Sequence, residues 1–338
     1  MPDGRTHTAE RPTAERPRDE GAPGPNGDRP APESPTDIHG RGWFAVLKRT
    51  VSEFREDNLT DWAAALTYYT VLSVFPALLA LAAILGLLGQ NPQTTNALLK
   101  VIGDIGPSSA VDTFRAPIQS LITHKREAGI LLVVGLATAL WSASAYVGAF
   151  IRASNAIYER DEGRPFWKLR PMQLAVTLVM VLLVALVGIA IVVTGPLAKA
   201  IAGPIGLGNA AVTAWSIAKW PVLLAVVMLM LAILYYWAPN VRPPKFRWIT
   251  PGSVLAVIVW ITASAGFAVY VANFGSYDKT YGSLGAVVIA LIWLWISNIA
   301  VLLGQELNAE LERERELEAG DRRAHREIQV EPRSAPAD

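Results

Sequence analysis

The sequence predicts an all-α fold, namely a polytopic membrane helix bundle with six transmembrane helices and further interfacial amphipathic helices. Only 17% of its residues are charged, against about 25% in an ordinary soluble domain. The charges are unevenly spread, because six uncharged runs of 22 to 38 residues interrupt them. Each run exceeds the roughly 20 apolar residues that cross the hydrocarbon core of a bilayer. A soluble protein with six such helices would have no polar face to present to water.

The residues before the first uncharged run divide into two parts. Residues 1–40 are rich in Pro, Gly and mixed charge. They cannot bury enough apolar area to fold, so we expect a disordered cytoplasmic tail. Residues 41–57 place Leu47, Val51 and Phe54 at helical spacing among basic residues. Such a helix suits an anionic membrane surface, and it suits packing against the protein's own core equally well.

The membrane domain is expected over residues 41–312. Its six spans are predicted at about 63–89, 129–151, 172–194, 217–238, 250–272 and 284–304. The long segment 90–128 carries apolar residues at helical spacing, which predicts one or two amphipathic helices, either surface-lying or re-entrant. Residues 313–338 are highly charged and are expected to form a partly disordered cytoplasmic tail.

The distribution of Lys and Arg among the short loops predicts the orientation. Loop 154–171 holds four of them and loop 239–249 holds three, whereas the loops between these hold one each. The rich loops, and both termini with them, are therefore expected on the cytoplasmic side of a bacterial inner membrane that the chain crosses several times.

The first predicted span is unusual because it carries five hydroxyl groups and a proline. A helix breaker at Pro76 removes one backbone hydrogen bond and predicts a kink. The hydroxyls cover most of the helix circumference, so protein must surround the helix. They are either contacts between helices or the polar lining of a pathway. These residues are Thr67, Tyr68, Tyr69, Thr70 and Ser73.

The last predicted span carries a second polar signal. Asn298 lies about three quarters of the way along it, where an amide must face the bundle or a wet cavity. At the inner face, Asp61, Arg152 and Glu306 are placed to form a charge cluster. This cluster is either a set of interhelical ion pairs or a site for a substrate or a proton.

Three stretches carry a family resemblance: "AAALTYYTVLSVFPALLAL", "AYVGAFIRASNAIYE" and "YGSLGAVVIALIWLWISNIAVLLGQELNAEL". They resemble the YihY/BrkB family of bacterial inner-membrane proteins over about residues 41–312. The resemblance implies six spans and names no mechanism. Members have been labelled ribonuclease BN, but the four histidines of this chain lie in tails or in one loop, far apart in sequence. A metal-dependent hydrolase needs clustered ligands, so we expect no enzyme, no metal and no cofactor.

The function expected from these observations is transport-like, or the handling of lipid or envelope material. Few charges accompany the Tyr, Thr and Ser side chains, which favours an amphipathic substrate, with membrane lipids as partners. A scaffold or envelope-assembly factor is the alternative, and a membrane-bound enzyme is a third. The net charge of +1 gives no basic field for nucleic acid. A homo-oligomer would be compatible with the sequence.

Overall fold

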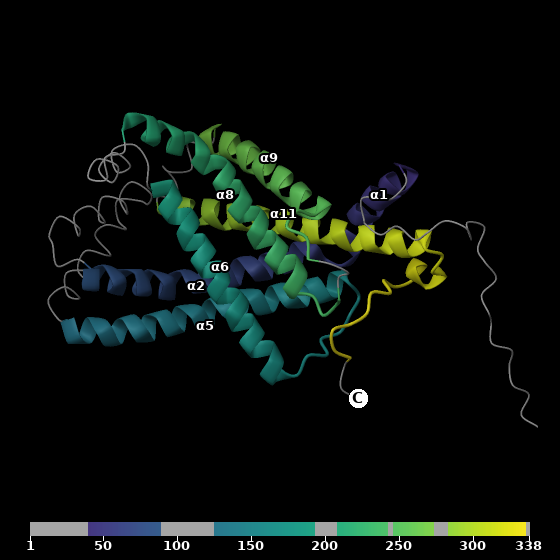
Figure 1. Ribbon diagram of the computed structural model, residues 1–338, viewed down its shortest axis with the longest axis horizontal. Coiled ribbons are helices and arrows are strands. Elements are labelled where there is room, and N and C mark those ends of the chain that lie inside the picture. Colours follow the sequence, from purple (N-terminus) through teal and green to yellow (C-terminus); the bar gives the residue numbers. More distant parts are fainter. Residues whose placement is uncertain (1–39, 89–124, 193–207, 243–245, 274–282, 336–338) are drawn as a thin grey trace, which may run out of the picture.

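The structure is a computed structural model that describes residues 40–88, 125–192, 208–242, 246–273 and 283–335 (Figure 1). Within these ranges the chain is all-helical, and the one β-type contact is an isolated bridge between Val241 and Pro332. The elements are α1 (Gly40–Glu56), α2 (Leu59–Leu88), α5 (Lys125–Ile157), α6 (Phe166–Val192), α8 (Asn209–Trp237), α9 (Pro251–Asn273), α11 (Ser283–Glu318) and the short 3-10 helix η2 (Arg322–His325).

Five helices in the described ranges are long and apolar enough to cross a membrane, namely α5, α6, α8, α9 and α11. The all-α class is therefore confirmed. Helix α2 has 30 residues and is about 45 Å long at 1.5 Å per residue, but its side chains are described only as far as Ser73. The sixth span stays a prediction, and so does the kink at Pro76. Residues 1–39 and 89–124, which include the predicted tail and most of the 90–128 segment, lie outside the described ranges.

The long helices form a closed ring. Helix α2 packs against α5, α5 against α6, α6 against α8, α8 against α9, and α9 against α11, which returns to α2. Helix α11 also reaches α5 across the ring. Apolar residues occur on every face of these helices, so the hydrophobic pattern alone does not say which face points inward.

The crossing of α9 and α11 depends on two glycines. A Cβ atom at Gly252 would collide with the carbonyl oxygen of Gly304, and one at Gly304 would collide with the carbonyl oxygen of Gly252. The hydroxyl of Tyr235 on α8 would lie 2.6 Å from a Cβ at Gly304. The backbones of the two helices are therefore so close at this crossing that there is room only for glycine at both positions.

Helix α1 packs on the end of α11 rather than on the ring. Val46 is fully buried against Leu307 and Leu311. Phe44 and Val51 remain 76% and 53% exposed on another side of the same helix. The helix thus has one apolar face on the protein and another that the described residues leave uncovered.

The residues after α11 do not extend into solvent. The backbone amide of Arg242 donates to the carbonyl of Glu331 (2.8 Å), and that of Arg333 donates to the carbonyl of Asn240 (3.0 Å). Ile328 is fully buried. The described part of the expected tail, as far as residue 335, therefore packs on the bundle and bonds to the α5–α6 and α8–α9 loops. We call it the C-terminal strap (residues 319–335).

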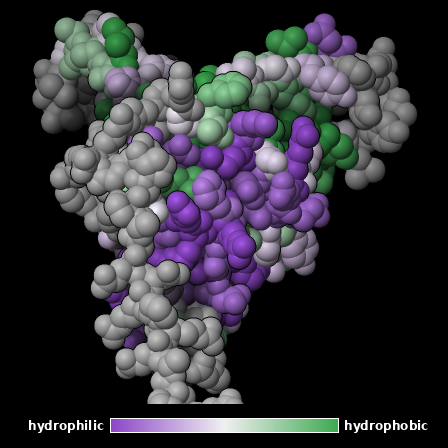
Figure 2. Space-filling model, turned by 90° about the vertical axis from the view of Figure 1, so that its right-hand side faces the viewer, coloured by the Kyte–Doolittle hydropathy of each residue, from purple (hydrophilic) through white to green (hydrophobic). Residues whose placement is uncertain are grey.

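One end of the bundle is strongly polar. It comprises α1, the last turns of α11, the strap and the loops 158–165 and 238–242, and we call it the charged end. Figure 2 faces this end and shows a broad hydrophilic surface across its middle. Both Lys/Arg-rich loops lie here.

Candidate functional site

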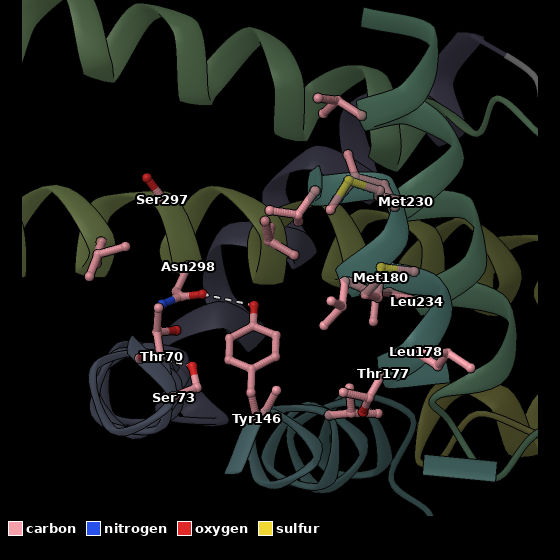
Figure 3. A pocket seen from close by; sticks show the side chains of 18 of the residues that line it. Thr70, Ser73, Tyr146, Thr177, Leu178, Met180, Met230, Leu234, Ser297 and Asn298 are labelled. Carbon is pink, nitrogen blue, oxygen red and sulfur yellow. Dashed lines mark hydrogen bonds between the residues drawn. The ribbon is translucent and has the colours of Figure 1, made fainter. Parts of the chain in front are cut away.

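A cavity of about 760 Å³ lies inside the helix ring, with lining residues from α2, α5, α6, α8, α9 and α11. This volume is within the range of about 300–1,000 Å³ that is typical of small-molecule sites. Most lining side chains are Leu, Val, Ala or Met. Figure 3 shows methionines and leucines on one side of the cavity, facing a polar group on the other. The hydrogen-bonding side chains of the lining are Thr70, Ser73, Tyr146, Thr177, Trp260, Ser297 and Asn298.

Asn298 joins three helices at the polar side of the cavity. Its Oδ1 accepts a hydrogen bond from the hydroxyl of Tyr146 on α5 (3.0 Å), as Figure 3 shows. Its Nδ2 donates to Oγ1 of Thr67 on α2 (3.1 Å). Thr67 in turn donates to the carbonyl of Ala63 (2.8 Å). The amide therefore has partners on both sides, although it is only 6% exposed.

The five hydroxyls of α2 do not act as one face. Thr70 and Ser73 line the cavity and donate back to the carbonyls of Leu66 (2.9 Å) and Thr70 (2.7 Å). Tyr68 is 59% exposed, and Tyr69 packs against the hydrophobic core. Tyr146 was not among the predicted site residues. Its signal was a phenol inside an uncharged run, six residues before Arg152, where its hydroxyl group needs a partner that lipid does not supply.

The predicted charge cluster has other members than expected. Glu306 is buried, whereas Asp61 and Arg152 are exposed. Arg152 instead lies near Gly148 and Gln173, between α5 and α6. The charges that act on Glu306 are those of Asp57, Glu310, Glu53 and Arg313. All three residues were expected near the inner face of the membrane. Asp61 and Arg152 nevertheless lie on exposed sides of their helices, away from the buried Glu306.

Arg313 is the centre of the ion pairs at the charged end. It lies 2.6 Å from Glu159, 2.9 Å from Glu310 and 3.5 Å from Glu53, and its side chain is 7% exposed. Arg49 of α1 pairs with Glu310 (2.7 Å) and with Glu314 (2.6 Å). These pairs attach α1 and the end of α5 to the extension of α11 beyond its uncharged part.

Next to these pairs lie polar atoms without partners among the described residues. They are Oε2 of Glu306 and both amide atoms of Gln305, and the two residues are at most 1% exposed. Within the described ranges, no three His, Asp or Glu side chains are grouped to hold a metal ion.

Asp57, at the turn between α1 and α2, has a carboxyl group that takes up a proton more readily than usual. Burial raises the pKa of Asp57 to about 6, and the negative charges of Glu53 and Glu159 act in the same direction. The folded state therefore binds this proton more tightly than the unfolded state. The stabilising contribution is present at about pH 4 and is lost as the pH rises through about 6.

Asp57→Asn should therefore raise the melting temperature in detergent at about pH 7.5 and leave it nearly unchanged at about pH 4.5, where the carboxyl of the unmodified protein is mostly protonated. Thermal unfolding of both proteins at the two pH values measures this. Asp161→Asn, at an exposed position of the same end, is the control and should change little. An equal shift at both pH values would contradict the assignment to Asp57.

Asn298→Leu should cost about 1–2 kcal/mol of stability, because it removes a hydrogen-bonded amide that joins helices. It leaves the hydroxyl of Tyr146 without its acceptor. Thermal unfolding in detergent measures the cost, and Tyr68→Phe, at an exposed ring, is the control. If the stability loss were no larger than that of the control, the amide would not hold the helices together and would serve the cavity instead.

Comparison with known proteins places the chain among bacterial membrane proteins. The model of the family described as virulence factor BrkB matches residues 50–329. A ribonuclease-like protein, YfkH, of Bacillus subtilis is 31% identical over 274 residues, which are 81% of this chain and 98% of that protein. A UPF0761 membrane protein of Mannheimia succiniciproducens is 26% identical and covers 82% of this chain and 92% of its own length. A UPF0761 membrane protein of Alteromonas mediterranea is 25% identical, with 77% and 85% covered. No solved structure matches.

Proposed function

The chain belongs to the BrkB family of membrane proteins, and we propose on this premise that it holds the apolar part of an amphipathic, lipid-like molecule in its central cavity. The role is transport-like or serves the handling of lipid or envelope material. The observation that carries the proposal is the cavity of about 760 Å³ at the centre of the helix ring, apolar along most of its wall and polar at Tyr146 and Asn298.

The chemistry of the wall matches such a molecule. Apolar side chains from six helices would surround hydrocarbon much as lipid chains do, so an acyl chain could lie there without contact with water. The polar side, at Thr70, Ser73 and Asn298, offers hydrogen bonds to an ester or hydroxyl group. A strongly charged small solute would find few partners there.

The proposal includes six spans, with α2 as the sixth, in a bacterial inner membrane and with both termini cytoplasmic. Two observations support it. Helix α2 completes the ring that the five apolar helices begin. The Lys/Arg-rich loops α5–α6 and α8–α9 lie with α1 and the strap at one end, as the positive-inside rule requires of a cytoplasmic face.

A scaffold without a substrate is the second candidate. The broad hydrophilic surface of the charged end, seen in Figure 2, favours it, since such a surface suits soluble partners. An enzymatic step is not part of the proposal. The ribonuclease-like name belongs to the Bacillus subtilis relative, and within the described ranges this chain has one histidine, His325, on η2.

Retention of lipid by the purified protein tests the proposal. Ala143→Phe and Ala139→Phe each add a ring to the cavity wall contributed by α5. We expect the unmodified protein to co-purify with lipid, detected by native mass spectrometry, and each variant to lose most of it. Ala137→Phe adds the same ring at an exposed position of α5 and should retain it.

Each protein is also tested for thermal unfolding, so that lost lipid is not mistaken for lost structure. Two cavity variants are compared, so that the test can still be read if one of them does not fold. Equal lipid content in the cavity variants and the control would contradict the proposal. A lipid-free, stable unmodified protein would favour the scaffold.

A further inference from the structure

Two arginines border the cavity wall between α5 and α6. Arg152 directly follows the uncharged run 128–151 of α5, and Arg170 directly precedes the uncharged run 171–198 of α6. Both therefore lie where a helix leaves the apolar part of a membrane, at the charged end of the bundle. No carboxylate lies within ion-pair distance of either one among the described residues.

Gln173 lies between these two arginines. Its Oε1 accepts a hydrogen bond from Nη1 of Arg170 (3.2 Å). A Cβ atom at Gly148 would lie 3.3 Å from Nε2 of Gln173 and 3.8 Å from Nη1 of Arg152, so both groups reach the same spot on α5. Gly148 is buried, and because it has no side chain the amide of Gln173 can approach its backbone closely. Gln173 itself is only 6% exposed.

Aromatic rings hold the guanidinium of Arg170. Its Cζ atom lies 5.2 Å from the ring centroid of Trp141 and 5.6 Å from that of Phe166. Contacts of this kind restrict the planar group without neutralising its charge. Trp141 and Phe166 are themselves largely exposed, Phe166 at the start of α6 and Trp141 within the uncharged run of α5.

This polar spot lies about one helical turn from residues that line the cavity. Thr177, which lines the cavity, follows Gln173 by four residues, which is about one helical turn. On α5, Tyr146 and Val147 line the cavity and directly precede Gly148. A molecule whose hydrocarbon lies in the cavity would therefore bring its polar end to Gln173 and the two arginines.

We infer that Arg152, Arg170 and Gln173 bind the phosphate of a phospholipid whose acyl chains occupy the cavity. This inference rests on the proposed function and names its substrate class. Guanidinium groups donate parallel hydrogen bonds to phosphate oxygens, and the amide of Gln173 adds a neutral donor. A free phosphate ion offers the same oxygens, but it would leave the apolar wall unused.

The test measures binding to the full-length protein in detergent. The probes are fluorescent phosphatidylglycerol, diacylglycerol with the same acyl chains and label, and inorganic phosphate as competitor. We expect the unmodified protein to bind phosphatidylglycerol at least about tenfold more tightly than diacylglycerol. Arg152→Gln/Arg170→Gln should lose most of this preference and keep its affinity for diacylglycerol.

Three further variants sharpen the result. Arg152→Gln alone changes an exposed residue, so folding should be unaffected, and it should lose part of the preference. Arg170→Lys keeps the charge but cannot stack or donate in parallel, and it should fall between the unmodified protein and Arg170→Gln. Arg322→Gln, at an exposed position of η2, controls for surface charge and should change nothing.

The outcomes separate the two proposals. If phosphatidylglycerol and diacylglycerol bind equally well and the arginine variants do not differ, the phosphate site is overturned while the lipid cavity stands. If neither lipid binds to the unmodified protein, the proposed function is overturned and the phospholipid assignment with it. If inorganic phosphate displaces phosphatidylglycerol completely and diacylglycerol does not bind, the site takes free phosphate and the lipid assignment is overturned.

Discussion

Arg313→Met should lower the free energy of unfolding by about 3–5 kcal/mol, which is the usual cost of breaking a buried ion pair from one side. Arg313 is the shared partner of Glu159, Glu310 and Glu53, and its side chain is 7% exposed. Methionine replaces most of its apolar stem but none of its charge. Three carboxylates would then lie close together with Arg49 as the remaining cation of this group.

Thermal unfolding in detergent measures this loss at about pH 7.5, where the carboxylates are charged most fully. Arg323→Met is the control, because Arg323, which pairs with Asp321, is exposed to solvent and its loss should change the stability little. The double variant Arg313→Met/Glu159→Gln should recover part of the stability, since it removes one unpaired charge. A loss no larger than that of the control would contradict the central role of Arg313.

Gly304→Leu should disrupt the crossing of α9 and α11 and cost at least about 3 kcal/mol, with Gly304→Ala at about 1–3 kcal/mol. Even a Cβ atom at this position collides with the backbone of Gly252 and lies 2.8 Å from Cβ of Ala256. Because the obstacle is largely backbone, it cannot move away as the end of a flexible side chain would. The helices must separate instead.

Gly188→Ala is the matched control, because a Cβ atom at Gly188 on α6 meets nothing within 4 Å. Alanine is the better helix former, so this change should be neutral or stabilising by up to about 1 kcal/mol. Thermal unfolding of the three variants, together with their elution volumes in size-exclusion chromatography, separates a local clash from general sensitivity to glycine replacement. If Gly304→Ala were as stable as Gly188→Ala, the close crossing would be refuted.

The sequence was most informative where a single physical cause dominates. Uncharged runs of more than 20 residues become long helices because lipid satisfies no backbone hydrogen bonds, and five of the six are such helices in the structure. The expectation that the hydroxyls of the first span and Asn298 need polar partners rests on the same cause, and the structure places the side chains of Asn298 and Thr67 3.1 Å apart. Whether they serve a substrate is part of the proposal.

The sequence was least informative where helix rotation decides the contacts. Glu306 is influenced by the charges of Asp57 and Glu310, whereas Asp61 and Arg152 are exposed, because residues at one depth can point in opposite directions around a helix. The cavity has no sequence signature either, since its leucines and valines resemble those that face lipid.

The C-terminal strap escaped prediction for a different reason. Its composition is that of a solvated tail, and its buried residues, Ala324, Ile328 and Val330, form no helical or strand period. Its placement depends on backbone hydrogen bonds to the α8–α9 loop and on hydrogen bonds with the side chains of Glu159 and Arg160 in the α5–α6 loop, both far earlier in the chain. Such pairings depend on the finished bundle and cannot be deduced from the local sequence.

The position of the strap along the chain has a consequence for the order of assembly. It is synthesised after α11, yet Arg160 of the α5–α6 loop donates to the carbonyl of Ile328, and Asn240 of the α8–α9 loop donates to that of Ser334 (2.8 Å). The two loops therefore leave the ribosome long before the residues that will join them. Until then the charged end is held by helix packing, by the ion pairs of Arg313 and by direct bonds between the loops such as that of Arg164 to the carbonyl of Ala238 (2.8 Å). Fastening of the two loops by the strap thus has to follow the synthesis of α11, and a chain that stops within α11 would lack these bonds.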